Sequence, residues 1–329
     1  MEEQARRKTG ILILGYGGPD SLQAIGPFMT NLMGREPSPE LLERARLRYL
    51  SIGGESPLPG IVSSIRDQLQ QALASEDHDV HVAIGMRYWH PFIEEGVREL
   101  VDAGVNRIVG VSMSPFEAKI TCGAYRTAVQ DALSGVPDVE YEEAPSIATL
   151  VEYSELVAAG CLAALEKLDD SSGALVVFTA HSLPESDLVQ DDPYVSGLRR
   201  VVDRACEYLG YDHGTEPIGD PILPGVTTYG NLASRPPWVF AYQSKGQKPG
   251  PWLGPDLGDV IDAAVVAGYN AVVAVPVGFV TDHLETLYDL DIEAADRALT
   301  QDIEFVRAPV PNDSEHLVKG LVSLVKPLL

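Results

Sequence analysis

The chain has 329 residues, which is enough for about two domains of ordinary size. Apolar residues make up 45% of it and charged residues 22%, a composition that supports a packed core and excludes an intrinsically disordered protein. With 24 Lys and Arg against 48 Asp and Glu, the formal charge is −24. So acidic a chain is not expected to bind nucleic acid or to carry a polybasic membrane anchor.

The strand candidates are short, mostly continuous apolar runs, as expected for parallel strands that are covered on both faces. In chain order they are 11–14, 80–84, 107–111, 175–179, 238–242 and 271–275. Longer helical patterns lie between and after them, at 20–33, 38–50, 60–75, 91–103, 119–133, 148–168, 192–209, 256–267, 282–299 and 313–327. Alternation of this kind predicts an α/β fold with right-handed crossovers.

The strands fall into two sets, and we therefore predict two similar doubly wound domains that face each other. The first covers 1–145 and the second 146–312, while the helix within 313–329 is expected to pack back on the first domain. A stretch at 213–237 is rich in Gly, Pro and Thr and is predicted to be an inserted loop.

The number and spacing of the cysteines indicate the cellular compartment in which the protein works. Cys122, Cys161 and Cys206 are too few and too scattered for a disulfide framework or a four-thiolate metal site. The longest uncharged stretch, 263–280, is interrupted by Gly and Pro and does not read as a membrane span. These features predict a cytoplasmic protein with no stable membrane insertion.

In open parallel sheets, ligands bind beyond the carboxyl ends of the strands. The first strand runs into a glycine-rich turn at 15–18, but the full Gly-x-Gly-x-x-Gly pattern is missing, so a tight turn explains it better than a dinucleotide site. The fourth strand leads into His181, which suits either a hydrogen-bonded core histidine or a functional one. A Ser182–His–Asp triad is a poor alternative because the nucleophile-elbow motif is absent.

An acidic stripe follows the sixth strand. Five carboxylates with spacings of 3, 4, 4 and 3 are predicted on one helix face: Asp282, Glu285, Asp289, Glu293 and Asp296. The outer two, Asp282 and Asp296, are best interpreted as part of a solvent-exposed acidic helix face. For the central three, a path or site for a hydrated divalent cation is a serious alternative, since hard cations prefer carboxylates. A His181–Glu285 pair could bind a borderline metal or act as a base near neutral pH.

Several blocks resemble the ferrochelatase family, in order and over nearly the whole chain. The two longest are FTAHSLP at 178–184 and VGFVTDHLETLYDLDIE at 277–293. Shorter matches lie at 51–58, 192–194, 242–244 and 251–256. The resemblance implies two Rossmann-like domains with a porphyrin cleft between them, and insertion of Fe²⁺ into a porphyrin in haem biosynthesis.

The resemblance also implies roles for individual residues. His181 and Glu285 would face each other across the cleft at the metal-insertion centre, with His181 as the base that takes a pyrrole proton. Asp289 and Glu293 would form an outer cation site, which could hold Mg²⁺. Tyr16 resembles the tyrosine of the coproporphyrin branch, whose phenol approaches the product iron as an axial ligand.

Further positions resemble that branch's contacts to the porphyrin propionates: Arg48, Tyr49, Ser56 and Tyr125. Arginine suits such a contact because its guanidinium pairs with a carboxylate through two hydrogen bonds. A plain surface arginine is the competing interpretation of Arg48. We therefore predict a coproporphyrin III ferrochelatase that makes coprohaem, acts as a monomer and has coprohaem decarboxylase, the next enzyme of haem synthesis, as a partner. With three cysteines, no iron–sulfur cluster is expected.

Some residues depart from the coproporphyrin pattern. The arginine usually found just before Gly34 is missing, and Arg35 follows that glycine instead. The segments 25–28 and 87–91 look more like the protoporphyrin branch. Alternatives are therefore a protoporphyrin IX ferrochelatase making protohaem, a chelatase for another divalent metal such as cobalt or nickel, and a non-catalytic tetrapyrrole or haem carrier.

Overall fold

The structure is a computed structural model that describes residues 8–76, 78–189, 192–211, 223, 227–230, 235–246 and 248–329. The chain divides into two compact units. Unit 1 comprises Met1–Glu152 and Asn312–Leu329, and unit 2 comprises Tyr153–Pro311. The C-terminal residues thus group with the N-terminal half.

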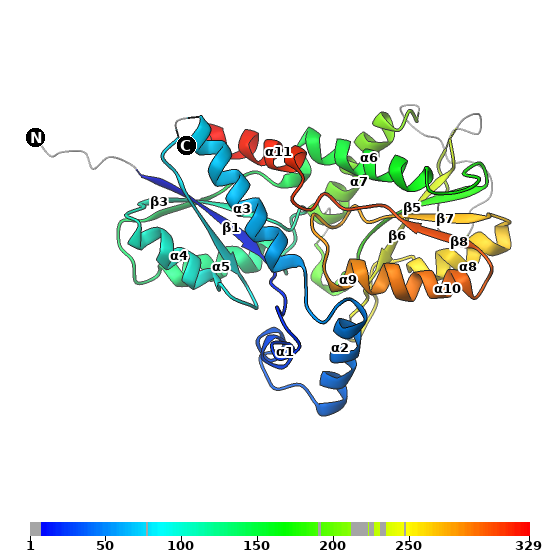
Figure 1. Cartoon of the computed structure of the whole chain (residues 1–329), viewed down its shortest axis with the longest axis horizontal. Coiled ribbons are helices and arrows are strands. Elements are labelled where there is room, and N and C mark those ends of the chain that lie inside the picture. Colours follow the sequence, from blue (N-terminus) through cyan, green and yellow to red (C-terminus); the bar gives the residue numbers. More distant parts are fainter. Residues whose placement is uncertain are drawn as a thin grey trace, which may run out of the picture. The chain divides into compact units, whose positions relative to one another are not determined.

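Each unit is built on one parallel sheet (Figure 1). The strands are β1 (Thr9–Gly15), β2 (His81–Met86), β3 (Arg107–Ser112), β4 (Glu140–Glu143), β5 (Ala174–His181), β6 (Trp238–Gln243), β7 (Ala271–Val275) and β8 (Glu304–Arg307). Within the described residues, the order is β2-β1-β3-β4 in unit 1 and β6-β5-β7-β8 in unit 2. Both sheets thus follow one topology, and the predicted α/β fold with two similar doubly wound sheets is confirmed.

Helices cover both faces of each sheet (Figure 1). They are α1 (Ile25–Met33), α2 (Pro39–Ser51), α3 (Leu58–Ser75), α4 (Ile93–Asp102), α5 (Cys122–Leu133), α6 (Val151–Leu165), α7 (Pro193–Tyr208), α8 (Leu257–Ala267), α9 (Leu284–Leu287), α10 (Ala295–Leu299) and α11 (Glu315–Val325). In unit 1, α4 and α5 pack on one face and α3 and α11 lie on the other; in unit 2, α8 and α10 lie opposite α6 and α7.

The central strands are buried throughout, and this is why their sequences are continuous apolar runs. In β5, for example, 174–180 are all fully buried. Several helices begin at a side chain that accepts a hydrogen bond from a free N–H of the first turn. Ser38 caps α2, Asp192 caps α7, Asp256 caps α8 and Ser314 caps α11.

The sequence patterns missed β4 and β8. Each is the last strand of its sheet and pairs on one side only, with β3 and with β7. Edge strands of this kind are short and carry charged residues, which also keeps them from pairing with other chains. The sequences EYEE and EFVR therefore lack the apolar run that identifies the inner strands.

The continuous helix predicted at 282–299 is wrong. The structure has the short α9, then a π-helical segment at Asp289–Ala294, then α10. The N–H of Glu293 donates to the carbonyl of Tyr288, five residues earlier. This wider turn changes the angle between successive residues, so spacings of three and four no longer keep the five carboxylates on one face.

Most of the predicted insertion at 213–237 lies outside the described residues. Among the described helices, none is both long and apolar enough to cross a membrane.

Candidate active site

The chemistry-bearing residues of unit 2 gather where its strand order reverses. The chain crosses from β5 to β6 on one side of β5, and the next strand, β7, lies on the other side of β5. His181 is the last residue of β5, and the segment after β7 leads into α9, which carries Glu285. In sheets of this type the switch point opens a crevice at the carboxyl ends of the strands.

His181 and Glu285 meet directly. The Nε2 atom of His181 lies 3.5 Å from Oε1 of Glu285, and both side chains are about one-third exposed. The Nδ1 atom of His181 lies 2.5 Å from the carbonyl oxygen of Ser182, which can only accept, so Nδ1 carries a hydrogen and Nε2 is the nitrogen that faces the carboxylate. The Nε2 atom of His283 lies 3.5 Å from the other oxygen of Glu285. Both predicted catalytic residues therefore belong to unit 2.

The two groups shift each other's acidity. Burial alone would lower the pKa of His181, but the Glu285 charge and hydrogen bonds to Glu285 and Ser182 outweigh it and raise the pKa to about 9. Burial would raise the pKa of Glu285, but the two histidines hold it well below its usual range. The unliganded pair is therefore an imidazolium and a carboxylate near neutral pH.

Replacing Glu285 by glutamine is expected to return the pKa of His181 towards its unperturbed value of about 6.5. Since the folded-state pKa of about 9 lies above the unfolded value, the ion pair stabilises the fold fully below about pH 6.5 and this contribution is lost as the pH rises through 9. The urea midpoint of E285Q should lie below that of the wild type near pH 6, and the two should converge near pH 10. Imidazole NMR titration gives the pKa directly, and a His181 pKa still near 9 in E285Q would contradict this account.

Three buried side chains fix the backbone around the pair. Nε2 of Gln243, at the end of β6, donates to the carbonyl of Glu285 at 3.1 Å, and its Oε1 accepts from Thr179 at 2.7 Å. The hydroxyl of Tyr194 donates to the carbonyl of His181 at 2.8 Å. Gln243 and Tyr194 stand inside family-like blocks, but the sequence alone assigned them no role. The signal available in the sequence was their position, just after a predicted strand and near the start of a predicted helix.

The five carboxylates predicted on one helix face differ in their surroundings. Asp282 comes before α9 and pairs with Arg307 at 3.0 Å, so it is not part of an open stripe. Asp289 accepts a hydrogen bond from Ser244 at 2.5 Å. Glu293 and Asp296 are exposed. No group of three or more His, Cys, Asp or Glu side chains in the described part of the chain is arranged to hold a metal ion.

Two of the predicted substrate-binding residues lie near the carboxyl end of β1 in unit 1. Tyr16 follows β1 and is 39% exposed, and its ring lies edge-on to that of Tyr88 at 4.8 Å between centroids. Ser56 packs against Gly18, where a side-chain carbon would lie 2.5 Å from the Ser56 hydroxyl. A glycine is thus required for Ser56 to sit beside the Tyr16 turn.

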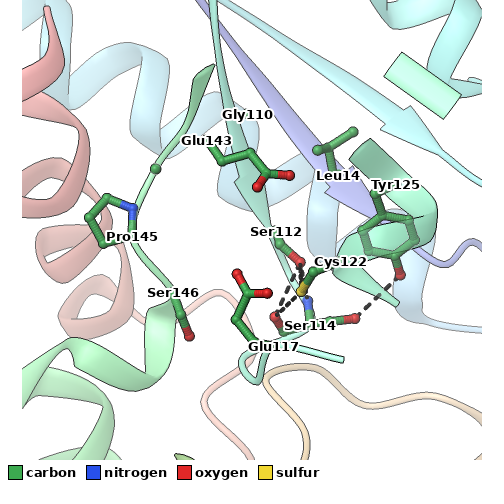
Figure 2. Close-up of a pocket in the computed structure, with 11 residues that line it drawn as sticks. Leu14, Gly110, Ser112, Ser114, Glu117, Cys122, Tyr125, Glu143, Pro145 and Ser146 are labelled. Carbon is green, nitrogen blue, oxygen red and sulfur yellow. Dashed lines mark hydrogen bonds between the residues drawn. The ribbon is translucent and has the colours of Figure 1, made fainter. Parts of the chain in front are cut away.

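Of the remaining three, two are buried. Arg48 is partly buried on α2, and its neighbour Tyr49 is 5% exposed. Tyr125 is 1% exposed, and its hydroxyl lies 3.3 Å from Oγ of Ser114. Figure 2 shows Tyr125 at the wall of a small polar cavity beyond β3, with Ser114 and Cys122. The cavity measures about 20 Å³, which is room for one water molecule rather than a carboxylate group.

Comparison with known proteins identifies the family. The ferrochelatase family model matches residues 8–328. The chain belongs to the ferrochelatase family. Ferrochelatases are lyases that insert iron into a porphyrin, so this chain is a metal-inserting enzyme of haem biosynthesis.

The curated ferrochelatases that match cover almost the whole chain. The ferrochelatase of Herpetosiphon aurantiacus is 32% identical over 323 residues, spanning 97% of this chain and 98% of the relative. The coproporphyrin III ferrochelatase of Mycobacteroides abscessus is 33% identical and spans 96% of this chain and 87% of the relative. That of Halalkalibacterium halodurans is 30% identical, with 98% and 97% covered.

Among solved structures, SirB from Bacillus subtilis with Fe³⁺ matches this ferrochelatase with a TM-score of 0.55. It covers 97% of this chain and 94% of SirB. The two are 11% identical, so the match supports the fold alone.

Proposed function

We propose that this ferrochelatase inserts Fe²⁺ into coproporphyrin III to form coprohaem. The observation that carries the catalytic part is the His181–Glu285 contact at the switch point of unit 2. A porphyrin loses two pyrrole protons when it gains a metal, and the site offers a nitrogen base and a carboxylate side by side. Two protein ligands leave coordination positions open for the porphyrin nitrogens.

The order of events follows from the shifted pKa of His181. With a pKa of about 9, the imidazole of the free enzyme holds a proton and cannot act as a base near neutral pH. A divalent cation that binds to Glu285 would replace the imidazolium as the partner of the carboxylate. Its charge would expel the Nε2 proton. His181 is then neutral and able to accept a proton from the macrocycle.

The other predicted site residues stay part of the proposal. Tyr16, exposed at the end of β1, is suited to meet iron from the product's other face. Arg48 supplies a cation for a propionate, assisted by Tyr49, Ser56 and Tyr125, although the burial of the last three requires local opening. Asp289 and the exposed Glu293 form the outer site at which a hydrated cation such as Mg²⁺ would bind.

The substrate choice rests on Tyr16 and on relatives named coproporphyrin III ferrochelatases at 30–33% identity. The segment 87–91 favours the second candidate, protoporphyrin IX. We also propose that the enzyme works in the cytoplasm as a monomer and passes coprohaem to a decarboxylase. The three free, buried cysteines fit a reducing compartment.

Anaerobic assays with Fe²⁺ and each porphyrin, followed by the Soret shift, separate the candidates. We expect kcat/KM for coproporphyrin III to exceed that for protoporphyrin IX by about tenfold or more, because each charged hydrogen bond to an extra propionate is worth about 1.5–3 kcal/mol. Faster turnover of protoporphyrin would reverse the substrate assignment. Parallel runs with Co²⁺ and Ni²⁺ test the other chelatases, and binding without any turnover would identify a carrier.

A further inference from the structure

A single arginine ties down both ends of the segment that carries Glu285. Arg307 ends β8 and its side chain is 13% exposed. Its Nη1 lies 3.0 Å from Oδ1 of Asp282, while Nε and Nη2 contact the two oxygens of Asp291 at 2.7 and 2.9 Å. Asp282 precedes α9 and Asp291 lies in the π-helical segment, so Glu285 sits between the two anchored aspartates.

The Asp282 end of this clamp continues to the residues around Glu285. The hydroxyl of Thr286, which is fully buried, lies 2.9 Å from Oδ1 of Asp282. The same hydroxyl accepts the backbone N–H of His283 at 3.0 Å. His283 in turn contacts the Glu285 carboxylate. Arg307 is therefore connected to Glu285 through an unbroken set of polar contacts.

The segment depends on such anchoring. A helix of four residues, the length of α9, is far too short to form without tertiary contacts. The segment 282–293 also carries five carboxylates, at 282, 285, 289, 291 and 293. The cationic partners near them are Arg307, which contacts Asp282 and Asp291, and the histidines beside Glu285. Like charges at this spacing repel, and Arg307 offsets two of them at once.

We propose that Arg307 is a positioning residue for metal insertion, which holds the Glu285 carboxylate opposite His181 by bridging Asp282 and Asp291. The inference rests on the proposed function. A role in position rather than in general stability predicts a specific kinetic signature: the affinity for the metal falls, while the affinity for the porphyrin, whose proposed contacts lie in unit 1, does not.

The test compares R307Q with R307K and with a matched control. A misplacement of a catalytic group by about 1 Å costs about 100-fold in rate, and we expect a smaller displacement of Glu285 in R307Q. KM for Fe²⁺ should therefore rise about tenfold. KM for coproporphyrin III should stay unchanged within about twofold. Lysine keeps the charge but cannot bridge two carboxylates with a planar fork, so R307K should lie between R307Q and the wild type. Direct titration with Zn²⁺ should show the same order of affinities.

Arg297 provides the control, because it makes a similar two-pronged pair with Asp262 on the surface of unit 2. R297Q should leave both KM values unchanged. An unchanged KM for Fe²⁺ in R307Q, or equal rises in both KM values, would overturn the proposal. If R307Q does not fold, D291N removes one half of the clamp at a side chain that is 38% exposed, and the same criteria apply to it.

H181A, run in the same assay, separates this inference from the proposed function. Wild-type turnover in H181A would remove the basis of both. Loss of turnover in H181A together with wild-type behaviour of R307Q would reject the role of Arg307 alone.

Discussion

Replacing His181 by alanine is expected to reduce Fe²⁺ insertion by about 10²–10⁴-fold, the usual contribution of a positioned proton-transfer group. The contact of Nδ1 with the Ser182 carbonyl fixes the ring so that Nε2 points to Glu285. The Nε2 atom of His283 approaches the other oxygen of Glu285, from the N-terminal end of α9 rather than from the end of β5. Porphyrin binding should persist, because its proposed contacts lie in unit 1.

Single-turnover insertion kinetics and porphyrin fluorescence quenching measure the two effects separately. His81 offers a matched control, since its Nε2 also contacts a glutamate, Glu99, at 2.7 Å, but on the exposed surface of unit 1. H81A should insert iron at the wild-type rate. Near-normal turnover in H181A would place the base elsewhere.

The inner strands, and the proximity of His181 and Glu285, could be predicted from the sequence for a clear physical reason. Strands that are buried on both faces need continuous apolar runs, and the residues that follow them must then lie at one edge of the sheet. His181 ends β5 and Glu285 follows β7, the adjacent strand, so their proximity follows from the strand order.

What the sequence patterns missed depends on tertiary contacts. The strand β8 was missed because it is a charged edge strand, and Arg307, its last residue, was missed with it. The spacing of apolar residues in the segment Asp289–Ala294 is also compatible with an α-helix, so the sequence does not show that the segment is π-helical. The hydrogen bond from the N–H of Glu293 to the carbonyl of Tyr288 shows it. The burial of Tyr125 likewise depends on how α5 packs on its sheet, which residue spacing does not specify.

The backbone segments that lead to His181 and to Glu285 approach each other closely at Gly278. The N–H of Gly278 donates to the carbonyl of Thr179 at 3.1 Å, and the hydroxyl of Tyr153 donates to the carbonyl of Val277 at 2.8 Å. A side-chain carbon at 278 would lie 2.8 Å from both Cα and Cβ of Ala180, the residue before His181. Because backbone cannot rotate out of the way, even alanine must push the two segments apart.

G278A is therefore expected to lower kcat/KM by about 100-fold, the cost of misplacing a catalytic group by about 1 Å. Overpacking at this contact should also cost about 1–3 kcal/mol of folding free energy, measured by urea unfolding. Gly60 in α3 has open space where a side-chain carbon would be, so G60A should keep full activity and gain about 0.5–1 kcal/mol from its better helix propensity. If G278A is as active as G60A, the pair must tolerate displacement, and the role assigned to this contact is wrong. A folded but inactive G278A would instead show that the contact of Gly278 with Ala180 sets the distance between His181 and Glu285 on which insertion depends.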